Sequence, residues 1–151
     1  MHTFLKRYVA KWILSVFRYR WMASIILLGL IDFISYQAFT LGGVMLPVRF
    51  QDKILHCGAF MVLYILGHLS LNFDFFPGIK GFSFRILALN WMVWLSYGFM
   101  IEAVQSLLNH RSASVGDFIA DVCGIALGCT AVLAMNIYPP TQEAGTYEER
   151  L

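Results

Sequence analysis

Four long apolar stretches, separated by short polar segments, dominate the pattern of the chain. They cover about residues 21–39, 54–73, 85–108 and 116–138. A helix that crosses the hydrocarbon core of a bilayer needs roughly 20 mostly apolar residues. Only a helix satisfies every backbone polar group within one such segment. The pattern therefore predicts an all-α fold, a four-helix transmembrane bundle.

The segments at the two ends of the chain are polar. Residues 1–20 interleave aromatic and basic side chains, which is typical of an amphipathic helix in the membrane interface. The first apolar run is long for a signal sequence and no small-x-small cleavage site follows it closely, so we interpret it as a retained anchor. We predict a basic N-terminal segment over 1–20, a membrane domain over 21–138 and a disordered polar tail over 139–151.

Composition supports a membrane protein and argues against other classes. Hydrophobic residues make up 59% of the chain and charged residues 13%, whereas a soluble domain has about 25% charged residues. The net charge of +2 gives no indication of a nucleic-acid partner. The three cysteines lie inside apolar runs and are odd in number, so a disulfide framework is not expected.

The distribution of Lys and Arg predicts the orientation of the spans. Four spans place both termini on one side of the membrane. Eight basic residues belong to that side, namely Lys6, Arg7, Lys11, Arg18, Arg20, Lys80, Arg85 and Arg150. Three belong to the other side, namely Arg49, Lys53 and Arg111. The termini are therefore predicted to be cytoplasmic, and the connections near residues 40–53 and 109–115 to face outward.

Ionisable residues gather near this predicted outer end. Asp52 and His56 are four residues apart, and Glu102 lies about 9 Å below the outer end of the third span at 1.5 Å per residue. Asp117 and Asp121 begin a series that Gly124 and Gly128 continue at +7 and +11, so all four share one helix face. Charges facing lipid cost several kcal/mol, so these faces are expected to turn inward. The glycines permit close helix approach.

The sequence therefore predicts a buried polar cluster with a ligand-binding role. Its candidate residues are Asp52, Lys53, His56, Glu102, Gln105, Arg111, Ser114, Asp117 and Asp121. The alternative is that the acidic groups only pair with the nearby cations and hold the helices in register, without any chemistry.

The same residues resemble those of a known family. The stretch Asp52-Lys53-x-x-His56 is similar to the opening motif of VanZ-like membrane proteins. The later motifs are Glu102-x-x-Gln105, Arg111-Ser112-x-Ser114-x-x-Asp117, and then Gly124 and Gly128. The resemblance covers roughly residues 52–128. It departs at Phe60, where the family often has Tyr, and at Asp121, where it usually has Asn.

The resemblance implies a small multi-pass protein of the bacterial cytoplasmic (inner) membrane. The family's namesake is associated with resistance to the glycopeptide teicoplanin, and its biochemical activity is not established. We expect a cell-envelope accessory protein that binds a lipid, a lipid-linked precursor or a glycopeptide-like ligand at the outer leaflet. Lys53 and Arg111 would hold a phosphate or carboxylate group. A homo-oligomer is compatible with this reading.

Two other functions remain open. One is a membrane-embedded enzyme on the same substrate class, with His56 or Glu102 in acid–base catalysis and Asp117 as a further candidate. A hydrated metal on His56, Glu102 and Asp117 is a variant of it, but no metal-binding spacing such as HExxH occurs, so we predict no metal and no cofactor. The other is a proton-coupled transporter that uses Asp32 or Glu102.

Overall fold

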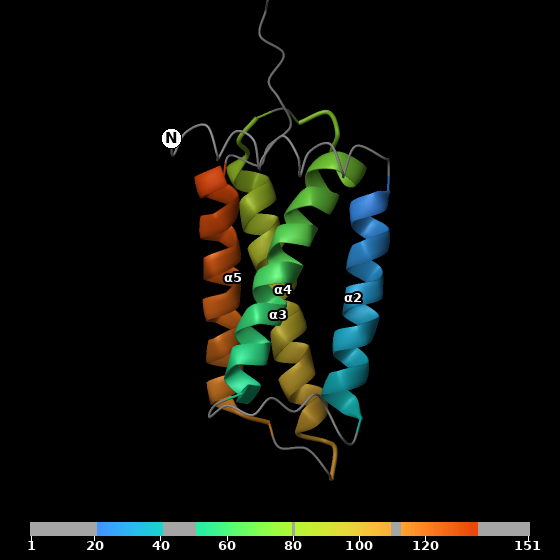
Figure 1. The fold of residues 1–151 in the computed structure, drawn as a ribbon, viewed down its shortest axis with the longest axis vertical. Coiled ribbons are helices and arrows are strands. Elements are labelled where there is room, and N and C mark those ends of the chain that lie inside the picture. Colours follow the sequence, from blue (N-terminus) through green and yellow to red (C-terminus); the bar gives the residue numbers. More distant parts are fainter. Residues whose placement is uncertain (1–20, 41–50, 80, 110–112, 136–151) are drawn as a thin grey trace, which may run out of the picture.

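The protein is a bundle of four long antiparallel helices, as the computed structural model in Figure 1 shows. The structure describes residues 21–40, 51–79, 81–109 and 113–135. Its elements are α2 (Met22–Phe39), α3 (Gln51–Ser70), the π-helical turn η1 (Leu71–Phe75), α4 (Phe84–Gln105) and α5 (Val115–Met135). The described residues contain no strand. The predicted N-terminal segment and polar tail lie outside these residues.

All four helices are long and apolar enough to cross a membrane. Large hydrophobic side chains cover their outer surfaces; for example, Phe84 is 74% exposed and Met92 and Phe99 are each 67% exposed. A water-soluble protein rarely exposes contiguous apolar surface on this scale, whereas lipid chains solvate it at no cost. The all-helical, multi-pass membrane architecture predicted from the sequence is thus supported by the structure.

The third span ends earlier than predicted. Its helix α4 stops at Gln105 rather than near residue 108. The chain tightens there, because the N–H groups of Leu107 and Leu108 bond the carbonyls of Val104 and Gln105, three residues back. Glu102 therefore lies about 4.5 Å from the end of its helix, half the distance that the sequence indicated.

Helix α3 contacts α2, α4 and α5. Its closest neighbour is α5, and two glycines make this approach possible. A Cβ atom at Gly124 would collide with the carbonyl of Cys57, and one at Gly128 would lie 2.8 Å from the Met61 carbonyl oxygen. The two backbones meet without intervening side chains, as in small-residue packing motifs of membrane helices.

The bundle has two polar ends. At one, which we call the Asp74 end, α2 begins and η1 lies; at the other, the Lys53 end, α3 and α5 begin and α2 and α4 finish (Figure 1). At the Asp74 end, the buried Asp74 carboxylate accepts the backbone N–H groups of Trp21 and Ser24 at 2.8 and 3.0 Å. It also accepts the Ser24 hydroxyl at 2.6 Å. This carboxylate thereby caps the first turn of α2.

Between the two ends, a few polar side chains tie helices together within the apolar core. The buried Asn90 amide donates to the Tyr64 carbonyl at 2.8 Å and accepts the Trp94 indole N–H at 2.8 Å. The Tyr97 and Ser35 hydroxyls are 2.8 Å apart and join α4 to α2. These bonds join α4 to α3 and to α2, and they restrict the rotation of these three helices against one another.

Candidate functional site

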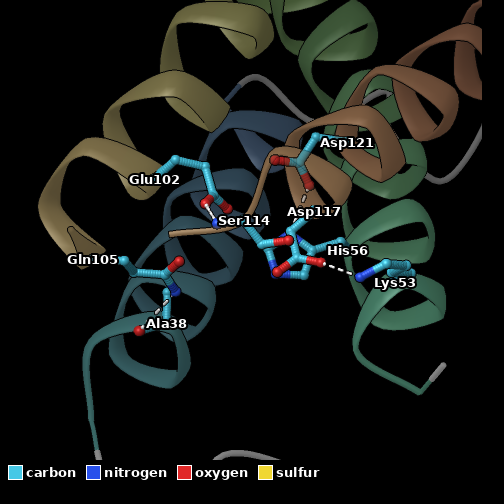
Figure 2. Close-up of polar contacts among 8 residues, drawn as sticks. All are labelled: Ala38, Lys53, His56, Glu102, Gln105, Ser114, Asp117 and Asp121. Atoms are coloured by element: carbon cyan, nitrogen blue, oxygen red, sulfur yellow. Dashed lines mark hydrogen bonds and ion pairs between the residues drawn. The ribbon is translucent and has the colours of Figure 1, made fainter. Parts of the chain in front are cut away.

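Charged side chains from three helices converge at the Lys53 end, as Figure 2 shows. We call this group the acidic cluster; its members are Asp52, Lys53, His56, Glu102, Asp117 and Asp121. The first three come from α3, Glu102 from α4, and the last two from α5. Asp52 is exposed, whereas Glu102, Asp117 and Asp121 are buried. The predicted inward orientation is observed for Glu102, Asp117 and Asp121, but not for Asp52.

Lys53 and Asp117 form the ion pair at the edge of the cluster. The Lys53 Nζ lies 2.9 Å from Asp117 Oδ1, and the Lys53 side chain is 44% exposed while that of Asp117 is 8% exposed. The Lys53 stem passes over Gly116, where a Cβ atom would lie 3.0 Å from Lys53 Cε. The ammonium group thus reaches a buried carboxylate while remaining accessible from the surface.

His56 and Asp121 form a second contact, deeper in the bundle. The His56 Nδ1 lies 2.7 Å from Asp121 Oδ1, and the ring N–H is the donor when the carboxylate is ionised. Gly98 of α4 leaves room for Asp121, because a Cβ atom there would lie 2.9 Å from Asp121 Oδ2. A histidine held by a carboxylate in this way has a fixed ring orientation, a common feature of basic and metal-ligating histidines.

Glu102 is held at the N-terminus of α5. Its Oε2 accepts the backbone N–H of Ser114 at 2.7 Å, and the Ser114 carbonyl accepts the N–H groups that open the helix. The partial positive charge of a helix N-terminus favours a carboxylate in this position. The contact brings the end of α4 against the start of α5 and leaves the second oxygen of Glu102, Oε1, buried.

The side chains of the remaining predicted residues that the structure describes do not belong to the acidic cluster. Gln105 donates from Nε2 to the Ala38 carbonyl at 3.1 Å and thereby joins the ends of α4 and α2. Ser114 contributes its backbone N–H to the cluster. Arg111 lies outside the described residues. Asp32, which the transporter hypothesis uses, is exposed on α2 and is not a member of the cluster.

The sequence analysis missed polar residues that the structure buries. Asp74 and Ser24 belong to the Asp74 end, and Asn90 lies in the core. The signal for Asp74 is its position directly after an apolar run with no basic neighbour in sequence. The sequence gives no signal for its partner, because Ser24 lies 50 residues away.

The geometry brings together donor atoms that suit acid–base or metal chemistry. Two trios have one ligand atom each within 4.8 Å of one another: His56, Glu102 and Asp121; and Asp52, His56 and Asp117. The trio considered from sequence, His56 with Glu102 and Asp117, combines members of both. The prediction of no metal rested on linear spacing alone, which takes no account of residues that folding brings together from different helices.

Comparisons with protein-family models, with curated proteins and with solved structures gave no match. The resemblance to VanZ-like proteins therefore stays a prediction from the motifs.

Proposed function

We propose that the chain is a multi-pass protein of the bacterial cytoplasmic membrane that binds the polar headgroup of an envelope lipid or lipid-linked precursor. The cluster faces the outer leaflet in this proposal, which follows the Lys and Arg distribution. One observation carries it. The accessible ammonium group of Lys53 lies beside buried hydrogen-bonding side chains at one end of the bundle.

The chemistry of a lipid headgroup assigns a role to each side chain of the cluster. Lys53 contacts the phosphate or carboxylate, since charge-assisted hydrogen bonds are the strongest available contacts. Asp117 holds Lys53 in place at 2.9 Å. Hydroxyl or amino groups of the headgroup donate to the buried carboxylates. Apolar side chains exposed around the bundle, such as Val115, which is 79% exposed, contact the lipid chains.

Lys53→Met is expected to weaken binding of an anionic lipid by about tenfold or more, because a hydrogen bond to a charged group contributes about 1.5–3 kcal/mol. The measurement is native mass spectrometry of the purified protein with lipids that carry a phosphomonoester, against phosphatidylcholine. Arg85→Met is the matched control, since Arg85 is an exposed cation at the start of α4, at the opposite end of the bundle.

A second variant separates binding from folding. Lys53→Met leaves the buried Asp117 without its cation, so the double variant Lys53→Met/Asp117→Asn is tested as well. Both are expected to lose the preference for the anionic lipid. Retention of that preference in the double variant, at normal protein levels, rules out the proposal.

The enzyme hypothesis is favoured by one further observation, the His56–Asp121 contact at 2.7 Å. A base oriented by a carboxylate is a recurring catalytic arrangement. In the same spectra, turnover would appear as a mass change of the bound lipid that depends on His56.

A further inference from the structure

Within the acidic cluster, three helices each contribute one side chain that can bind a metal ion. His56 of α3, Glu102 of α4 and Asp121 of α5 each offer one atom within 4.8 Å of the other two. In Figure 2 their side chains point toward the same region from separate ribbons. Glu102 is 9% exposed and Asp121 is fully buried. The contributing helices enclose the site on several sides.

Two carboxylate oxygens in this region have no hydrogen-bond partner. They are Glu102 Oε1 and Asp121 Oδ2, and both are inaccessible to solvent. The other oxygen of each group is occupied, by the Ser114 N–H and by His56 respectively. Among the described residues, no lysine or arginine pairs with either carboxylate. A buried acceptor left unsatisfied costs about 1–3 kcal/mol, and more if charged.

We propose that His56, Glu102 and Asp121 bind one divalent first-row metal ion, with Zn²⁺ as the best match. One imidazole and two carboxylates form a nitrogen–oxygen donor set that suits such ions, and three protein ligands leave a position open for water or substrate. Ligands about 2.0–2.2 Å from a metal lie roughly 3–4 Å apart, so small side-chain rotations close the observed spacing. Ca²⁺ and Mg²⁺ are poorer matches, because they prefer oxygen ligands alone.

The second trio, Asp52, His56 and Asp117, is a weaker site. Its Asp117 already accepts the Lys53 ammonium at 2.9 Å, and its Asp52 is exposed. A cation there would be repelled by Lys53 and solvated by water. Both trios need His56, so only one of them binds a metal at a time.

A metal ion would also offset the excess negative charge of the acidic cluster, which the proposed binding of an anionic headgroup requires. The cluster contains four carboxylates, and its cationic side chains are Lys53 and, when protonated, His56. An anionic headgroup would be repelled by this excess unless a further cation is present. The inference therefore deepens the proposed headgroup site, although metal binding itself requires no lipid.

The test measures Zn²⁺ binding to the full chain in lipid nanodiscs after treatment with a chelator. Because free thiols also bind Zn²⁺, all variants are made in a background with Cys57, Cys123 and Cys129 replaced by alanine. We expect one Zn²⁺ per chain by equilibrium dialysis and mass spectrometry of the metal, together with a rise in Tm. Glu102→Gln and Asp121→Asn are each expected to weaken binding at least about tenfold, since loss of even an outer-shell partner costs about 10–100-fold.

The matched control is Asp52→Asn, which is expected to keep one Zn²⁺ with unchanged affinity. The inference is overturned if the folded protein binds no stoichiometric Zn²⁺. It is equally overturned if Asp52→Asn abolishes binding while Glu102→Gln and Asp121→Asn do not. Absent Zn²⁺ binding together with Lys53-dependent lipid binding would remove the metal site and leave the proposed function standing.

Discussion

Replacement of Gly124 by alanine is expected to lower the free energy of unfolding by about 3 kcal/mol, the upper part of the range for overpacked interiors. The added methyl group would collide with the backbone carbonyl of Cys57, and its next neighbours, the Cys57 carbonyl carbon and Met61 nitrogen, are backbone atoms 3.0 Å away. Backbone atoms have no rotamer through which to move aside. Helices α3 and α5 must therefore separate, which also moves His56 away from Asp121.

The measurement is reversible unfolding of the purified protein in mixed micelles, followed by circular dichroism. Gly58→Ala is the matched control on α3, because a Cβ atom at Gly58 meets nothing within 4 Å. That change is expected to be neutral or to stabilise the helix by about 0.5–1 kcal/mol. If the two variants have the same free energy of unfolding, α3 and α5 do not pack as closely at Gly124 as described.

Asp74→Ala is expected to destabilise the protein by about 3 kcal/mol, since hydrogen bonds to a charged group contribute about 1.5–3 kcal/mol each and are not fully additive. The carboxylate accepts three hydrogen bonds from the first turn of α2. One donor is the backbone of Trp21, whose φ of 69° is unusual for a residue other than glycine. Without the carboxylate, these donors lose their acceptor at the start of α2.

The same unfolding assay tests this prediction. Asp74→Asn keeps the shape of the side chain and one acceptor oxygen, so an intermediate loss is expected. Asp52→Ala serves as the control for removal of an acid, because Asp52 is exposed. A stability of Asp74→Ala within about 0.5 kcal/mol of the parent, the range of ordinary surface substitutions, would show that Asp74 does not anchor α2.

The spans were predictable from sequence because each is a long apolar run. Helix α2 differs from the predicted segment by a single residue at its start. The end of α4 was less predictable, since Leu107 and Leu108 continue the apolar run beyond Gln105. Hydrophobicity alone carries no information on where a helix tightens into a turn.

The candidate site was predictable as a group of residues but not as a set of pairs. Helical periodicity alone placed Asp117, Asp121, Gly124 and Gly128 on one face, and the structure buries all four. Which carboxylate meets Lys53 and which meets His56 depends on the rotation and spacing of two helices. The contact of Gly124 with the α3 backbone sets that spacing, and it joins residues far apart in the chain.

Gln105 illustrates a contact of a motif residue that the sequence did not predict. The sequence placed it beside Glu102 on one face of α4. Its amide nitrogen donates to the carbonyl of Ala38, near the end of α2. A free carbonyl at a helix end attracts such a donor, and the sequence does not show which helix end lies nearby.

The charged cluster is expected to lie at the exported side of the membrane, and cysteine labelling tests this orientation most directly. In a chain without its native cysteines, Leu107→Cys reports the Lys53 end, where Leu107 is 82% exposed, and Gly78→Cys reports the Asp74 end. With a membrane-impermeant thiol reagent on intact cells, position 107 is expected to react at once and position 78 only after permeabilisation. The reverse pattern would place the cluster in the cytoplasm and contradict the account.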